Sequence, residues 1–175
     1  MTNSDQTWYV ILRLLHIASG VFWAGAVIYM AAFIIPAVKA LGPDGGKFMQ
    51  QLSRTNRLPL VMTIMPLTNV VAGVILFWKL SSGFQSAWMS SEHGMILSTG
   101  GGLAIIAFFI SLFVNRPIVV RISHLGQAMA KQGSPSTAEQ TQQLMVLRKK
   151  LFAATNIVAL LLALTVVAMS IAKYF

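Results

Sequence analysis

The sequence predicts an all-α integral membrane protein, a bundle of four spanning helices that forms one domain over residues 1–175. Of the 175 residues, 56% are hydrophobic and only 10% are charged, whereas a soluble domain carries about 25% charged residues. Four apolar stretches each supply the roughly 20 residues that a helix needs to cross a bilayer. These predicted spans cover residues 14–38, 58–78, 95–114 and 151–172.

The basic residues predict how the spans are oriented. Cytoplasmic loops of membrane proteins carry an excess of Lys and Arg. Most of the 13 basic residues here follow the first or the third span, namely Lys39, Lys47, Arg54, Arg57, Arg116, Arg121, Lys131, Arg148, Lys149 and Lys150. We therefore expect both termini outside (N-out/C-out), in a multi-pass protein of the inner (plasma) membrane. Topology and attraction to the lipid bilayer explain the net charge of +9, so nucleic acid is not an expected partner.

The first span follows an aromatic pair, Trp8 and Tyr9, at a position typical of interfacial anchors. Apolar residues continue to Val38, so we expect this segment to be retained rather than cleaved as a signal peptide. Glycine and proline between residues 41 and 46 predict a break. Residues 47–57 then predict a short helix on the cytoplasmic surface.

The remaining spans carry helix-distorting residues and polar side chains. Pro66 should bend the second span because it lacks a backbone N–H. Asn69 and Asn156 are amides that we expect to hydrogen-bond between helices. The third span stays helix-compatible to about Lys131, where residues 133–135 interrupt it. A capping box over residues 136–139 then starts the fourth helix, which predicts a helical hairpin extension on the cytoplasmic side.

Two histidines are the strongest functional signal in the chain. His16 lies 23 positions before Lys39, and His93 lies 23 positions before Arg116, each basic residue being the first charge after its span. Since 23 residues cover roughly 35 Å of helix, both imidazoles are expected at the same outer depth. Two facing imidazoles on neighbouring helices are typical ligands of haem b. The alternative is a pair of interfacial side chains that only form hydrogen bonds.

Four further residues complete the predicted haem site. Gly20 and Gly100 lie on the helical faces of the two histidines, where small residues would leave room for a porphyrin. Arg13, one turn before His16, and Lys79, at the end of the second span, would pair with the haem propionates.

Met89, His93 and Met95 form a rival metal site, because thioethers and imidazole suit Cu(I). The chain has no cysteine, which excludes disulfides, iron–sulfur clusters and thiolate-bound haem. Copper is therefore the alternative to haem b as the cofactor.

The residues around His16 carry a family resemblance. Residues 13–16 (Arg-Leu-Leu-His), followed by Trp23-Ala24-Gly25, resemble the first helix of the HemJ and CopD group of small membrane proteins. Residues 63–73, with Pro66 and Gly73, are similar to their second helix, and residues 150–162 are similar to the last helix of HemJ. The HemJ resemblance implies haem b bound by the first-helix histidine and oxidation of protoporphyrinogen. The CopD resemblance implies copper handling.

The third span departs from the HemJ pattern. HemJ proteins carry a functional lysine after a tryptophan early in this helix, whereas Trp88 is followed here by Glu92, His93 and Met95. We therefore interpret the chain as a HemJ-like haem protein of altered function, in which His93 takes the opposing ligand position.

The sequence thus predicts a membrane b-type haem protein, bis-histidine, that transfers electrons or carries out redox chemistry near the outer face. A quinone or a redox protein is the expected partner, and a homodimer would form through the glycine-bearing faces. The alternatives are CopD-like copper transport, HemJ-like protoporphyrinogen oxidation and a membrane assembly factor without a cofactor. Whether the protein is an enzyme stays open; membrane oxidoreductase is the class that fits.

Overall fold

A computed structural model shows a chain built from helices. The structure describes residues 3–54, 57–132 and 136–175, and these ranges contain no strand. Four helical segments are long and apolar enough to cross a membrane, namely Asp5–Ala40, Leu58–Leu80, Glu92–Lys131 and Ala138–Tyr174. The all-α prediction and the four long apolar helices are therefore confirmed, and together they suggest a membrane protein.

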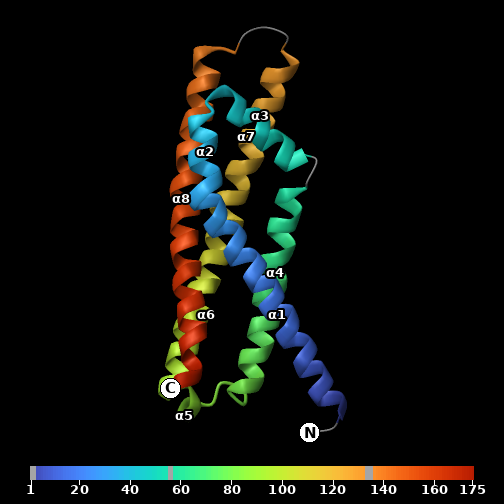
Figure 1. Cartoon of the computed structure of the whole chain (residues 1–175), viewed down its shortest axis with the longest axis vertical. Coiled ribbons are helices and arrows are strands. Elements are labelled where there is room, and N and C mark those ends of the chain that lie inside the picture. The colour runs from blue at the N-terminus through green and yellow to red at the C-terminus, as the bar shows by residue number, and fades with distance from the viewer. Residues whose placement is uncertain (1–2, 55–56, 133–135) are drawn as a thin grey trace.

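Most of these segments are composed of more than one element (Figure 1). In chain order the elements are α1 (Asn3–Tyr29), the π-helical turn η1 (Met30–Ile34), α2 (Ile35–Ala40), α3 (Pro43–Arg54), α4 (Leu58–Leu80), α5 (Ser86–Met89), α6 (Glu92–Ile110), the π-helical turn η2 (Ser111–Asn115), α7 (Arg116–Lys131), α8 (Ala138–Ile171) and the 3₁₀ turn η3 (Ala172–Tyr174).

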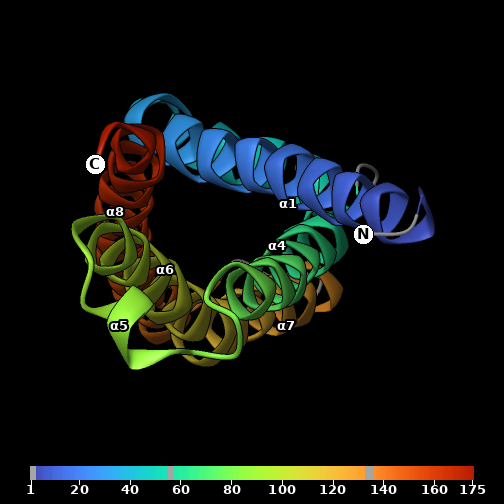
Figure 2. The same cartoon turned by 90° about the horizontal axis from the view of Figure 1, so that it is seen from below.

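The four segments lie side by side around a common axis (Figure 2). The most extensive helix contacts join α1 to α4 and α6 to α8, while α1 also packs on α8 and α4 on α6. Both chain ends lie at the same end of the molecule, which we call the terminal end (Figure 1). We call the opposite end, which carries α3, the end of α7 and the start of α8, the hairpin end.

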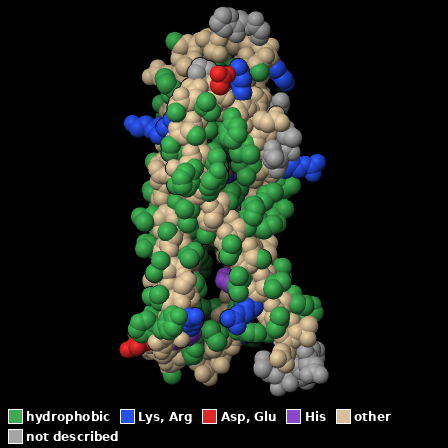
Figure 3. Space-filling model, viewed as in Figure 1, with side chains coloured by type: hydrophobic (Ala, Val, Ile, Leu, Met, Phe, Trp, Pro, Cys, Tyr) green, Lys and Arg blue, Asp and Glu red, His purple; other side chains and the backbone are tan. Residues whose placement is uncertain are grey.

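The buried core lies midway along the helices. It consists of small and large apolar side chains from three segments, namely Trp23, Ala24, Val27, Ala107, Val158 and Leu162. Trp23 is only 2% exposed. Large apolar side chains also cover the outside of the molecule (Figure 3), as expected where lipid replaces water as the solvent.

Two π-helical turns interrupt the first and third segments, and the sequence analysis did not predict either. Each is followed by a proline, Pro36 after η1 and Pro117 after η2. Proline has no N–H to continue an α-helix, and a π turn is a common local adjustment of the hydrogen-bond ladder. Pro66, by contrast, is buried within α4, which stays α-helical throughout.

The predicted connections need three corrections. The break after the first segment is confined to Leu41 and Gly42, and the short helix α3 begins at Pro43 rather than at residue 47. Within α3, Lys47 donates to Asp44 over 2.8 Å, and this hydrogen bond lowers the pKa of the Asp44 carboxyl. The capping box uses Thr137 and Gln140, one residue later than predicted, since these two side chains bond each other's backbone N–H. The predicted interruption at 133–135 lies outside the described residues.

Candidate functional site

His16 lies on α1 where this helix packs on α4, at a contact that we call the α1–α4 seam. Its Nδ1 atom is 2.9 Å from the backbone carbonyl oxygen of Asn69. Nδ1 also lies 3.2 Å from the Asn69 amide Nδ2. We assign the proton to Nδ1 because the carbonyl is the nearer of the two contacts and can only accept, which leaves the lone pair on Nε2. Nε2 has no hydrogen-bond partner among the described residues. The imidazole is therefore oriented through one nitrogen and able to bind a ligand through the other.

Asn69 returns a hydrogen bond to the same residue. Its amide Nδ2 donates to the backbone carbonyl of His16 over 2.8 Å, and the Asn69 side chain is buried. The two residues thus join α1 to α4 by two hydrogen bonds, one in each direction. This confirms the prediction that Asn69 bonds between helices, whereas Asn156 is exposed on α8.

Two glycines let the helices approach closely around this pair. A Cβ atom added to Gly73 would lie 2.8 Å from Cε1 of His16, and one added to Gly20 would lie 2.6 Å from Nδ2 of Asn69. The space beside Gly20, which the sequence assigned to a porphyrin, is therefore taken by the Asn69 amide. Because Gly73 has no side chain, the imidazole of His16 can pack against the backbone of α4.

His93 lies at the α6–α8 seam, in the first turn of α6. Its Nδ1 atom is 2.7 Å from the carbonyl oxygen of Ala172, and its ring lies edge-on to Trp88 with centroids 6.0 Å apart. The last carbonyl groups of a helix have no intrahelical donor. The Ala172 carbonyl also accepts from the backbone N–H of Phe175 over 3.3 Å, so His93 adds a second and shorter contact to it.

Gly100 also belongs to the α6–α8 seam and does not border a free space. A Cβ atom added there would lie 3.0 Å from the Ala168 Cβ. The Thr165 hydroxyl contacts the Gly100 carbonyl over 3.2 Å. The glycine predicted to face a cofactor thus serves close packing of α6 against α8.

The two histidines do not lie at the same depth, so this prediction is wrong. His16 contacts Asn69 in the middle of α4, whereas His93 lies beside Trp88, whose ring meets that of Phe77 near the end of α4. Phe77 follows Asn69 by eight residues. At 1.5 Å per residue, the difference places His93 roughly 12 Å closer to the terminal end.

The other predicted site residues are only partly brought together. Arg13 and Lys79 are exposed, and neither has an ion-pair partner among the described residues. Met95 is 52% exposed and lies two residues after His93, so the two side chains point to opposite sides of α6. This geometry separates Met95 from His93 and weakens the copper set, although Met89 lies in the adjoining α5.

An apolar groove of about 290 Å³ lies between α1 and α4, and neither His16 nor Asn69 is among its lining residues. It is lined almost entirely by apolar side chains, namely Leu12, Leu15, Leu67, Val71 and Ala72, with Thr68. Thr68 donates its hydroxyl to Ile64, so the groove offers no free donor to a ligand. Figure 3 shows histidine side chains in a hollow of the terminal half, close to basic side chains.

Within the described residues, no three His, Cys, Asp or Glu side chains gather where they could hold a metal ion. Comparison with family models, with curated proteins and with solved structures finds no match to this chain.

Proposed function

We propose that the protein is a membrane b-type haem protein in which Nε2 of His16 is the axial ligand. The observation that carries this proposal is the hydrogen bond from Nδ1 to the Asn69 carbonyl within a spanning helix. Ligating histidines are commonly fixed in this way by a backbone acceptor on the second nitrogen. Ionisable groups inside membrane helices are retained mainly for function.

The surrounding residues suit one edge of a planar apolar group. The groove between α1 and α4 is apolar and is lined by Leu15, the residue before His16. Arg13 stands one helical turn nearer the terminal end, where it would pair with a propionate. Bound haem b would supply one-electron redox chemistry. In this proposal His16 binds, Asn69 and Gly73 orient the ring, and the core around Trp23 closes the site toward the hairpin end.

The geometry favours one protein ligand over two. His93 lies nearer the terminal end, and its Nδ1 is held by Ala172 at the very end of α8. We therefore propose that His93 serves to bind the end of α8 and is not a haem ligand. The coordination position opposite His16 would then be open to an exchangeable ligand. An open position favours redox chemistry on a small substrate over simple electron transfer.

The orientation belongs to the same proposal. The basic residues Lys39, Lys47, Arg148, Lys149 and Lys150 lie toward the hairpin end, which would face the cytoplasm by the positive-inside rule. His16 would then lie in the outer half of the inner membrane.

A second candidate function is a membrane assembly factor without a cofactor. The hydrogen bonds of His16 to Asn69 and of His93 to Ala172 favour it, because both imidazoles already join two helices. This candidate requires no ligand on either Nε2 atom.

Absorption spectroscopy of the purified full chain separates the two candidates. Protein from haem-replete cells should show a Soret band and a b-type pyridine haemochrome. His16→Ala should remove both, whereas His93→Ala and His124→Ala, which changes an exposed residue of α7, should keep them. Circular dichroism of each variant checks that the helices persist.

Three results would contradict the assignment. Loss of the spectrum in His93→Ala with retention in His16→Ala would make His93 the ligand. A colourless wild type that takes up no haemin would favour the assembly factor. Bound copper that Met89→Leu and Met95→Leu remove would favour copper handling.

A further inference from the structure

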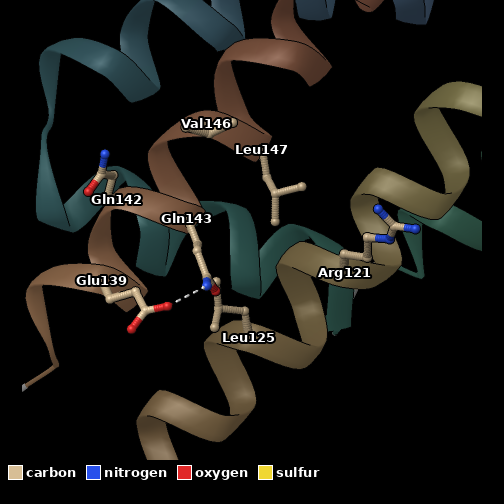
Figure 4. Close-up of a pocket in the computed structure, with 7 residues that line it drawn as sticks. All are labelled: Arg121, Leu125, Glu139, Gln142, Gln143, Val146 and Leu147. Atoms are coloured by element: carbon tan, nitrogen blue, oxygen red, sulfur yellow. Dashed lines mark hydrogen bonds between the residues drawn. The ribbon is translucent and has the colours of Figure 1, made fainter.

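A polar groove of about 560 Å³ lies between α7 and α8 at the hairpin end (Figure 4). Its floor is apolar, formed by Leu125 of α7 with Val146 and Leu147 of α8. Its polar groups are Arg121, Glu139, Gln142 and Gln143. The groove is far from the α1–α4 seam, and the proposed function does not use it.

The two charged residues stand at opposite ends of this groove. Figure 4 shows Glu139 at one end and Arg121 at the other, with Gln143 and Leu125 between them. Glu139 accepts a hydrogen bond from the Gln143 amide over 3.3 Å. Arg121 is exposed and has no carboxylate within ion-pair distance among the described residues.

The sequence positions of Arg121 and Glu139 show which of the two charges lies nearer the apolar segments. Arg121 lies five residues after Arg116, at the start of α7, which corresponds to about 7 Å of helix. Glu139 lies in the first turn of α8, nine residues before Arg148, or about 13 Å. The positive end of the groove is thus nearer the apolar segments, and the negative end is farther out.

We propose that this groove binds the headgroup of a phosphatidylethanolamine lipid from the surrounding bilayer. Such a headgroup carries its phosphate next to the acyl chains and its ammonium farther out, which matches Arg121 and Glu139 in sign and in order. The guanidinium would donate to the phosphate, and the ammonium would donate to the Glu139 carboxylate and the glutamine oxygens. Val146 and Leu147, next to Arg148, would contact the glycerol and the upper acyl carbons, and Leu125, between the two charged residues, would contact the ethanolamine carbons.

The acid at the outer end selects among lipid classes. An anionic headgroup that ends in hydroxyl groups would leave Glu139 without a cation, and a choline headgroup has no N–H to donate. Basic clefts between helices at a membrane surface commonly bind lipid headgroups. The proposal depends on the membrane placement of the segments but not on haem.

Native mass spectrometry of the purified full chain tests the site with defined lipids. Affinity should fall along the series phosphatidylethanolamine, its N-methyl and N,N-dimethyl forms, and phosphatidylcholine, because each step removes one N–H donor. Arg121→Gln and Glu139→Gln should each weaken phosphatidylethanolamine binding by about tenfold, as expected for a lost charge-assisted hydrogen bond. Lys131→Gln and Glu92→Gln, which alter exposed charges outside the groove, should leave it unchanged.

Two outcomes would overturn the proposal. Equal or tighter binding of phosphatidylglycerol, unaffected by Glu139→Gln, would show a site for anionic lipids. Equal binding of all lipids by all variants would show ordinary annular contact. Because Arg121 and Glu139 are exposed, the variants should fold, and an unchanged haem spectrum would separate failure here from failure of the haem proposal.

Discussion

The α1–α4 and α6–α8 seams contain the same kinds of residue, but their histidines differ in the carbonyl group that each one contacts. Each contains a histidine whose Nδ1 donates to a backbone carbonyl of the opposite helix, and each contains a glycine where the helices touch. At the α6–α8 seam the acceptor is Ala172, whose carbonyl stands at the end of a helix. At the α1–α4 seam the acceptor is Asn69, in the middle of α4, where the carbonyl already accepts from its own helix.

This difference shows which histidine is replaceable. The Ala172 carbonyl, at a helix end, accepts a 3.3 Å hydrogen bond from the Phe175 N–H and gains from a further donor, which any side chain with an N–H can supply. A carbonyl in the middle of a helix has no such need, so the Asn69 carbonyl gains little from His16. The stronger reason for a histidine at position 16 is therefore its other nitrogen, to which no described residue forms a hydrogen bond.

Exchange of each histidine for glutamine should give the largest contrast. Glutamine can donate to the Ala172 carbonyl, so His93→Gln should retain both stability and the haem spectrum. His16→Gln should lose the Soret band completely, because an amide is a poor ligand for haem iron. Absorption spectra of the two variants, purified in parallel, measure this contrast. If both variants lost the Soret band equally, the two histidines would contribute equally to haem binding.

Alanine in place of each seam glycine should give the next largest effect. Gly73→Ala should destabilise by roughly 1–3 kcal/mol, because the new methyl group meets the ring of His16. Gly100→Ala should cost less, since the new methyl group would lie 3.0 Å from the Ala168 Cβ, a less severe overlap than the 2.8 Å to His16 at Gly73. The control Gly101→Ala meets nothing within 4 Å and should stabilise by about 0.5–1 kcal/mol through helix propensity. Reversible unfolding in detergent micelles gives all three free energies.

Asn69→Leu should separate helix packing from ligand orientation. The variant removes the amide that donates to His16 but keeps the backbone carbonyl that holds Nδ1. We expect a loss of about 0.6 kcal/mol, the average for a hydrogen bond between membrane helices, with the haem spectrum retained. If the spectrum disappears while the helices persist, the side chain rather than the carbonyl positions the imidazole.

Thr165→Val should produce the smallest change. The hydroxyl contacts Gly100 across the seam, but it also donates to Leu161 in its own helix, so its removal should cost less than about 0.6 kcal/mol. Thr99→Val is the matched control, because that hydroxyl bonds only within α6. If Thr165→Val lowered the free energy of unfolding more than Asn69→Leu, the α6–α8 seam rather than the α1–α4 seam would contain the stronger hydrogen bond between helices.

The helices could be predicted from the sequence because their signal is long and continuous. Apolar runs of this length leave few alternatives, and the second span begins at Leu58 as predicted. The connections were less predictable, since Pro43 starts α3 where a break was expected. Local capping of this kind is decided by single hydrogen bonds.

The depth of the histidines could not be predicted because the charges used to measure it are poor markers. Lys39 lies 4.0 Å over the ring of Phe152, so its long side chain reaches back along the apolar surface. A first charge therefore does not fix the membrane boundary to within a helical turn. The partners of the histidines, Asn69 and the Ala172 carbonyl, depend on which helices meet, and neither spacing nor composition determines that pairing.

The π turns carry one further consequence for the hairpin end. A π turn holds one residue more than the α-helical turn it replaces, so it rotates everything that follows by about 100°. The direction in which α7 presents Arg121 and Leu125 is therefore set by a single surplus residue within Ser111–Asn115. Deleting Val114 would restore a regular α-helix and turn these side chains away from α8, while His16 on the first segment would keep its neighbours. In the third segment, the extra residue of the π turn thus sets the direction of the α7 side chains separately from that of the α6 side chains.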